Sequence, residues 1–186
     1  MLRLLAAAML AVMAGCATSP PPRFYRLTAE AAQAAATSSR AVIVGPFQFA
    51  DYLDRPQIVT RSGANAVTVA DFERWAEPLD ANFQGVVADN VSRLLGSDRV
   101  LEFPAQAIMK PERRVTGRVS QLDVDASGLA VLQVQWGVLE GDGASAQPAR
   151  RSRYEATAAD KTYDAKVAAL NAAVAKFSED VAAAVK

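Results

Sequence analysis

"RRVTGRVSQLDVDASGLAVLQVQWGVLE" (residues 113–140) is the stretch of sequence that decides the fold. Four large apolar residues alternate along its second half; these are Leu132, Val134, Trp136 and Val138. The residues between them are Gln133, Gln135 and Gly137. Successive side chains of a β-strand point to opposite faces, so this alternation predicts one buried and one solvated face. The turn-like Ala126-Ser127-Gly128 separates two predicted long strands, 113–125 and 129–140.

The residues after this pair predict a third strand and a helix. "GDGASAQP" (141–148) is rich in turn residues and predicts a hairpin tip, after which the chain returns as a strand over 149–159. From Tyr163 to Lys186 apolar residues recur at helical spacing; they are Val167, Leu170, Val174, Phe177, Val181 and Ala184. This stripe predicts an amphipathic helix that packs against the sheet.

A second amphipathic helix is predicted upstream, from Leu79 to Leu95. Pro78 suits the first helical position and Gly96 suits the end of the helix. Shorter strands are predicted at 24–28, 40–49, 56–61, 66–69 and 99–103. The alanine-rich residues 29–39 fit either a loose helix or a loop. The whole pattern predicts one α+β domain over 24–186, an antiparallel or mixed sheet with two amphipathic helices packed on one face.

Composition excludes several classes of function. The chain has 186 residues, with 20 basic and 20 acidic side chains, and no histidine. Balanced charge gives no sign of a nucleic-acid partner. Without histidine the chain lacks the commonest general base and the commonest metal ligand. We therefore expect no metal site and no cofactor.

The only cysteine, Cys16, follows a short basic and apolar leader. Arg3, the apolar run 4–13 and the small residues Ala14 and Gly15 are typical of a secretory signal peptide over residues 1–15. The run is too short to span a bilayer. The junction resembles the lipobox of bacterial lipoproteins, whose cysteine becomes an acylated N-terminus; Met13 stands where leucine is usual. An ordinary signal peptide is the alternative, and it would leave an exposed free thiol in an oxidising compartment.

The lipobox resemblance implies that Cys16 carries acyl chains such as palmitate, which anchor the protein stably. Ala17 stands where enterobacterial lipoproteins retained at the inner membrane have aspartate, which implies the outer membrane, facing the periplasm. Residues 16–23 form a proline-rich tether that spans about 25 Å at most. A partner from the other membrane must therefore approach the domain.

Two further motifs lie in residues 51–79. They are "YLDRPQIVTR" (52–61) and "WAEPL" (75–79). With the lipobox, the tether, "FYRL" (24–27) and the helix-then-strand pattern of 79–100, they resemble the PqiC/YmbA-type family of ABC-transport auxiliary lipoproteins. The resemblance covers nearly the whole mature chain, and over 104–186 it is one of pattern.

The resemblance implies a role in an MCE-type transport system, in which an inner-membrane ABC transporter and MCE-domain proteins move lipids or other hydrophobic molecules between membranes. The lipoprotein would dock the periplasmic MCE-domain conduit at the outer membrane and perform no covalent chemistry. A partner with rotational symmetry would suit a homo-oligomer of this chain. The alternative is an envelope lipoprotein that itself binds a hydrophobic ligand or chaperones an outer-membrane component.

Five residues are the candidate partner-binding set: Tyr52, Arg55, Arg61, Trp75 and Glu77. Exposed Tyr, Trp and Arg are enriched at binding hot spots. Each also has a structural interpretation. Trp75 would pack over the core, Glu77 would cap the helix that starts at Leu79, and the arginines would pair with Asp51, Asp54 or Glu73.

No set of residues predicts an active site. The acidic cluster (Asp51, Asp54, Glu73, Glu77 and Asp80) has no spacing that demands catalysis, and no phosphate-binding loop is present. We therefore expect no enzyme and no catalytic residue. Two arginine clusters, Arg113-Arg114-Arg118 and Arg150-Arg151-Arg153, suit anionic lipid headgroups, although protection of strand ends and edges is the more frequent role of such charges.

Overall fold

The computed structural model describes residues 19–34, 38–105, 108–141, 143–144 and 147–186. Its elements in chain order are β1 (Arg23–Tyr25), β2 (Val42–Phe49), the 3-10 helix η2 (Asp51–Leu53), β3 (Gln57–Arg61), β4 (Val67–Trp75), α2 (Leu79–Leu95), β5 (Val100–Glu102), β6 (Arg113–Asp125), β7 (Leu129–Glu140), β8 (Arg150–Thr157) and α3 (Tyr163–Val185). Within the described part of the chain, no helix combines the length and the apolar character needed to cross a membrane. The predicted signal peptide 1–15 and Cys16 lie outside the described residues and remain predictions.

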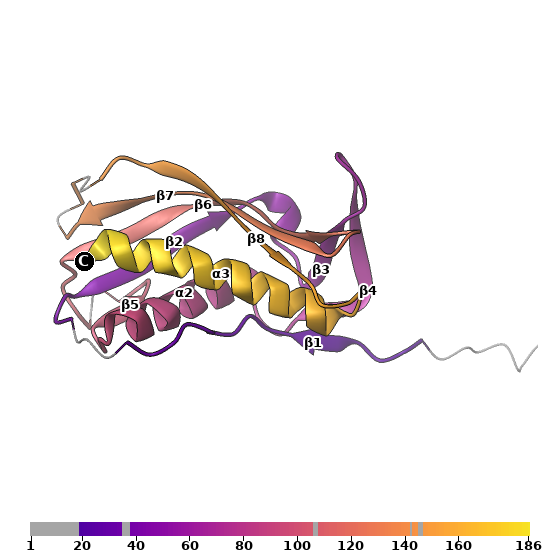
Figure 1. Ribbon diagram of the computed structural model, residues 1–186, viewed down its shortest axis with the longest axis horizontal. Coiled ribbons are helices and arrows are strands. Elements are labelled where there is room, and N and C mark those ends of the chain that lie inside the picture. The colour runs from indigo at the N-terminus through magenta and orange to yellow at the C-terminus, as the bar shows by residue number, and fades with distance from the viewer. Residues whose placement is uncertain (1–18, 35–37, 106–107, 142, 145–146) are drawn as a thin grey trace, which may run out of the picture.

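Eight strands form one mixed sheet, and α2 and α3 lie on the same face of it (Figure 1). The predicted α+β class is confirmed, as are the bounds of the two long strands β6 and β7. β6 is central. β7 pairs antiparallel along one side of it, while the other side is shared by two parallel neighbours, β2 at residues 113–119 and β3 at Val124 and Asp125.

The core between the helices and the sheet is built around Phe177 of α3. Its ring stacks on Phe83 of α2 with centroids 5.9 Å apart, and meets the edges of Phe47 at 5.9 Å and Trp136 at 5.4 Å. Offset and edge-to-face pairs of this kind are the favoured aromatic geometries. The predicted helical stripe is buried apart from the partly exposed Ala184, so α3 is held by the face that its sequence pattern indicated.

Both helices begin and end where sequence signals place them, with one shift. Pro78 is the residue before the first helical position of α2 and not that position itself. Gly96 ends α2 in the left-handed conformation, at φ 58°, which glycine adopts without steric cost. Thr162 precedes α3, and its hydroxyl accepts a hydrogen bond from the backbone N–H of Ala165 at 3.2 Å.

The strand predicted at 66–69 is much longer than expected. β4 continues to Trp75, so the segment that was predicted to lead into the helix is still a strand. The reason is a partner distant in sequence: β1 pairs parallel with the end of β4 and aligns Tyr25 with Trp75. β1 is correspondingly shorter than the predicted 24–28, because the chain leaves the sheet after Tyr25.

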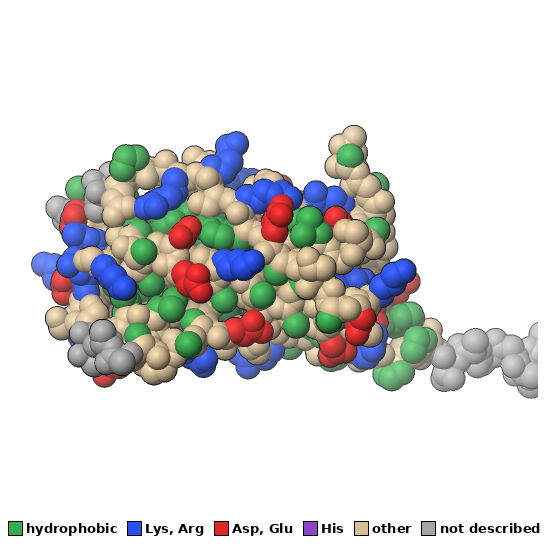
Figure 2. Space-filling model, viewed as in Figure 1, with side chains coloured by type: hydrophobic (Ala, Val, Ile, Leu, Met, Phe, Trp, Pro, Cys, Tyr) green, Lys and Arg blue, Asp and Glu red, His purple; other side chains and the backbone are tan. Residues whose placement is uncertain are grey.

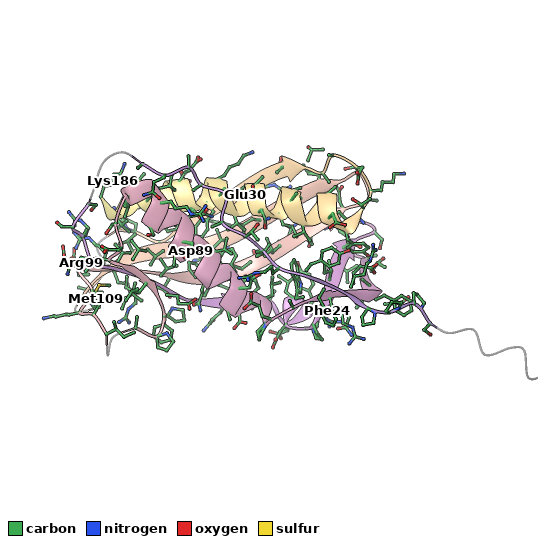
Figure 3. The ribbon with its side chains drawn as sticks, turned by 90° about the horizontal axis from the view of Figure 1, so that it is seen from below. Phe24, Glu30, Asp89, Arg99, Met109 and Lys186 are labelled. Carbon is green, nitrogen blue, oxygen red and sulfur yellow. The ribbon has the colours of Figure 1, made fainter. Side chains whose placement is uncertain are left out.

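Residues 26–34, which we call the strap, run outside the sheet along α2 and α3 without helical structure (Figure 3). Three buried asparagines bind it. Asn82 exchanges two hydrogen bonds with the backbone of Leu27, at 2.6 and 3.2 Å. Asn171 accepts from the backbone N–H of Thr28 at 3.1 Å, and Asn90 accepts from those of Glu30 and Ala31 at 3.0 and 2.9 Å.

The alanine-rich end of the strap has no helical structure, so of the two predicted alternatives, a loose helix or a loop, residues 29–34 form a loop. Asn90 is completely buried, and its amide nitrogen donates to the Ser178 hydroxyl at 3.3 Å. Buried polar groups are expensive unless they are hydrogen-bonded, and these side chains satisfy backbone groups that no neighbouring strand reaches. The strap is therefore fixed to both helices along its length.

Candidate docking site

The structure divides the five candidate residues into two groups. Arg55, Trp75 and Glu77 line one surface depression of about 340 Å³, together with Asp54, Pro56, Ala76, Pro78 and Leu79. Tyr52 and Arg61 do not belong to this depression. They meet instead at a buried carboxylate that the sequence analysis did not select.

The depression is formed where two segments of chain cross. β4 ends at Trp75, whose backbone N–H donates to the carbonyl of Pro56 at 2.6 Å, and the next N–H, of Ala76, donates to Tyr25 at 2.8 Å. These bonds fix the turn after η2 against the end of β4 and the start of α2. Arg55 and Glu77 thereby line the same hollow.

Trp75 forms a wall of the depression but is itself only 6% exposed and belongs to the core. This placement agrees with the structural interpretation of Trp75, that it packs over the core. Trp75 is therefore not an exposed aromatic anchor. It supplies an apolar lining that is held in place by the core.

The charges of the rim are close to solvent. Arg55 is exposed and, among the described residues, takes part in no ion pair or side-chain hydrogen bond. Glu77 faces Arg26, with Oε1 3.6 Å from Nη2. No side chain caps α2, so the expected capping role of Glu77 is absent. Neither arginine of the candidate set pairs with Asp51, Asp54 or Glu73; Glu73 pairs with Arg23 at 2.6 Å.

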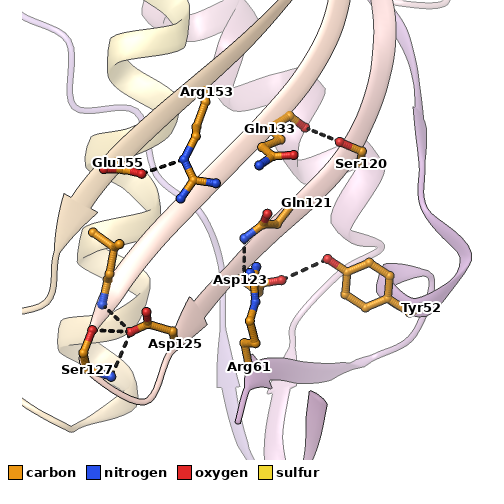
Figure 4. A network of polar contacts seen from close by, with 11 residues as sticks. Tyr52, Arg61, Ser120, Gln121, Asp123, Asp125, Ser127, Gln133, Arg153 and Glu155 are labelled. Atoms are coloured by element: carbon orange, nitrogen blue, oxygen red, sulfur yellow. Dashed lines mark hydrogen bonds and ion pairs between the residues drawn. The ribbon is translucent and has the colours of Figure 1, made fainter. Parts of the chain in front are cut away.

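Tyr52 and Arg61 converge on Asp123 of β6 (Figure 4). The Tyr52 hydroxyl donates to Asp123 Oδ2 at 2.9 Å, and Arg61 Nη2 lies 2.7 Å from Oδ1, which also accepts from Gln121 at 3.0 Å. Asp123 is 2% exposed. Burial, followed by the charge of the Asp123 carboxylate, raises the pKa of the Tyr52 phenol above its usual range.

Sequence reasoning missed Asp123 because its alternation with Leu122 and Val124 places it on the solvated face of β6. In the structure this side chain points away from the helices, on the face opposite to that of Leu122 and Val124. It is contacted by Tyr52 of η2 and by Arg61 of β3, the strand that pairs beside this end of β6. No local signal reports that coverage, because the covering residues precede Asp123 by more than sixty positions.

A second depression, of about 410 Å³, adjoins the first and shares Asp54 and Leu79 with it. Asp51, Asp54 and Asp80 line it, beside the apolar side chains of Phe47, Phe49 and Leu53. These carboxylates line an open hollow. Across the described residues, no group of three potential metal ligands is found. The arrangement is an open, charged hollow of a kind suited to binding.

Comparison with known proteins identifies one family. Residues 25–182 match the model of the ABC-type transport auxiliary lipoprotein component. The solved structure of an uncharacterised protein aligns with 90% of this chain and 100% of its own, at 20% identity and a TM-score of 0.74. A protein from Xanthomonas campestris, of the family model DUF330, aligns over 86% and 92% respectively, at 16% identity and a TM-score of 0.72. Both show the same fold. No curated protein matches the sequence.

Proposed function

The chain belongs to the family of ABC-type transport auxiliary lipoprotein components, and from this premise we propose that it docks the periplasmic MCE-domain conduit of an ABC transport system to the outer membrane. In this role Cys16 carries the lipid anchor, and the domain faces the periplasm. The conduit would carry lipids or other hydrophobic molecules between the two membranes. The protein itself performs no covalent chemistry.

The observation on which this proposal depends is the depression around Arg55, Trp75 and Glu77. Its base is apolar and rigid, and its rim carries charged groups in solvent, which is the anatomy of a protein-binding surface. Arg55 is exposed and unpaired within the described residues, so binding a carboxylate of a partner breaks no existing ion pair. The Trp75 side chain enters the complex already ordered, which lowers the entropic cost of binding.

The alternative, a carrier that encloses its own hydrophobic ligand, has less support. The space between helices and sheet is filled by the aromatic cluster around Phe177. The two depressions at the candidate site are open hollows with acidic or mixed rims. Ligand sites for apolar molecules are usually enclosed and lined mainly by apolar side chains.

Docking is tested by crosslinking in cells followed by pull-down of the lipidated protein and mass spectrometry. We expect capture of an MCE-domain protein, and less of it from a Cys16→Ser variant. Arg55→Glu should reduce that capture by about tenfold, the size of a modest hot spot. Lys110→Glu is the matched control, because Lys110 is exposed and adjoins Met109 at the opposite end of the molecule from β1 (Figure 3).

The two variants separate docking from folding. Arg55 makes no ion pair or side-chain hydrogen bond with any described residue, so Arg55→Glu should leave the melting temperature unchanged. Equal capture of the MCE-domain protein by both variants would refute the assignment of this depression. Capture of outer-membrane assembly proteins alone would favour the chaperone function.

A further inference from the structure

The sheet face opposite the helices carries a row of exposed polar side chains. In register across four strands stand Gln48 of β2, Arg118 of β6, Gln135 of β7 and Arg151 of β8. All four are exposed. Arg118 lies in the middle of the central strand, so protection of a strand end or a sheet edge does not explain it. We call this surface the open face.

A groove of about 380 Å³ crosses the open face at this row. Gly137 of β7, which stands opposite Thr116 of β6, has no side chain to fill the hollow. Arg118, Gln135 and Gln48 line it. A guanidinium group and two amides offer several hydrogen-bond donors that converge on one hollow, which is the chemistry that suits a phosphate group.

The open face has an excess of positive charge although the whole chain is neutral. Two arginines of this face are neutralised by ion pairs: Arg61 with Asp123 and Arg153 with Glu155. Within the described residues, Arg118 and Arg151 take part in neither a side-chain hydrogen bond nor an ion pair. Arg118 also borders the acidic depression, without an ion pair to its carboxylates.

The hairpin of β3 and β4 extends beyond the body of the domain (Figures 1 and 2). Val67 and Val69 of β4 are 49% and 37% exposed. Val67 is paired with Arg61, whose guanidinium reaches Asp123 on the open face, so the exposed valines lie on the side of the sheet that bears the arginines. Apolar tips beside cationic groups are typical of proteins that rest on a membrane surface.

We propose that the open face lies on an anionic phospholipid surface, with headgroup phosphates bound between Arg118 and Arg151 and the valines of the hairpin in the interfacial layer. The row of donors complements phosphate, and each basic side chain near an anionic surface adds attraction. The tether predicted for this lipoprotein is at most about 25 Å long, so the domain stays within reach of its own membrane. An acidic protein partner is the competing occupant.

The proposal is tested by flotation of the chain from residue 16 onward, with Cys16→Ser so that no acyl chain contributes. Vesicles are made of phosphatidylcholine alone or mixed with phosphatidylglycerol. We expect binding to the mixed vesicles only, weakened by added salt. Changing both Arg118→Glu and Arg151→Glu should weaken that binding by more than about tenfold.

The matched control changes Arg26→Glu and Arg55→Glu, which alters net charge equally at exposed sites around the docking depression. Its vesicle binding should remain within about twofold of the unchanged protein. Equal loss in both double variants would overturn the proposal, because charge alone would then explain binding. A second outcome would also overturn it: vesicle binding survives the Arg118 and Arg151 changes, while capture of a protein partner is lost. That result would indicate that an acidic protein occupies the open face.

The docking proposal and the membrane-contact proposal can be refuted separately. The first depends on Arg55 and is read by capture of an MCE-domain protein; the second depends on Arg118 and Arg151 and is read by vesicle flotation. Circular dichroism melting of each variant identifies any that has lost its fold. For a change that unfolds the chain, Arg118→Gln and Arg151→Gln replace the charge reversals, with the same expected direction.

Discussion

Asp123 shows how one residue changes its role through coverage. On a bare strand it would be a solvated carboxylate; here it is buried and holds Tyr52, Arg61 and Gln121 together. This contact links the central strand to η2 and β3, and so supports the turn from which Arg55 projects. Removing one member of a buried pair leaves the other without its partner.

We predict that Asp123→Ala lowers the free energy of unfolding by about 2–4 kcal/mol. The value is below that of a fully buried pair because Arg61 remains partly exposed. Asp71→Ala is the control, since Asp71 is exposed and should change stability by less than about 0.5 kcal/mol. Urea denaturation of both variants measures the difference, and equal midpoints would contradict a structural role for Asp123.

The raised pKa of the Tyr52 phenol predicts a loss of stability in alkali. A group whose pKa is higher in the folded protein stabilises the fold below its unfolded pKa of about 10, and the contribution disappears as pH rises through the folded value. We expect the ultraviolet ionisation curve of the folded protein to lie at higher pH than that of the unfolded chain. Tyr52→Phe should remove a late-titrating tyrosine; an unshifted curve would refute the prediction.

The effect of Trp75→Ala on stability tests whether Trp75 has a structural role. Because its side chain is in the core, Trp75→Ala should lower the free energy of unfolding by about 3–5 kcal/mol. Arg55→Glu on the same rim should not. A well-folded Trp75→Ala variant, measured by thermal unfolding, would show that this side chain is dispensable for packing and that its role lies in partner contact.

At the scale of elements, the sequence analysis succeeded where the signal is local. The alternation of 129–140 and the helical stripe of 163–186 indicate which face of each element is buried, whatever apolar surface covers it. They therefore predict β7 and α3 without knowledge of the rest of the fold. The extension of β4 and the path of the strap depend on β1, Asn82, Asn90 and Asn171. Those residues are distant in sequence from the segments that they position, and a single buried asparagine produces no periodic pattern in the sequence.

The candidate site follows the same division. Of the five residues predicted from the motifs at 52–61 and 75–79, Arg55, Trp75 and Glu77 line one depression, because the end of β4 and the turn before β3 bond to each other; their role in partner binding stays a prediction. It did not separate Tyr52 and Arg61, which face Asp123. Only the position of β3 beside β6 distinguishes the two groups.

The strap offers a test at the element scale. Asn90→Ala removes the acceptor for two backbone N–H groups in a buried setting, which should cost about 1–3 kcal/mol and expose the strap. We expect faster amide hydrogen exchange of Glu30 and Ala31, with β6 and β7 unchanged. Asn65→Ala, at the exposed hairpin tip, should leave exchange in the strap unaffected.

The whole molecule has two candidate binding surfaces, the docking depression and the open face. The depression of Arg55, Trp75 and Glu77 lies at the start of α2, while the arginine row lies on the sheet face that the helices leave bare (Figure 1). Contact with a membrane through the open face would leave the docking depression accessible to a partner.

This arrangement predicts a double dissociation. The Arg118 and Arg151 charge reversals should reduce vesicle flotation and leave capture of an MCE-domain protein through the depression intact. Arg55→Glu should do the reverse. The effects should combine additively in a triple variant, because Arg55 does not line the groove of the open face and Arg118 does not line the docking depression. Failure of both assays after either change, in protein that keeps its melting temperature, would mean that one surface serves both contacts.

The path of the chain from anchor to core has a mechanical consequence. If Cys16 is acylated as proposed, a pull on that anchor reaches the body through β1, which lies along β4, and then through the asparagine contacts of the strap. Tension applied along β1 shears its bonds together instead of peeling them one by one. Force on the proposed anchor would therefore be carried first by the edge strand β1 and by the strap along α2 and α3, before it loads the central strands.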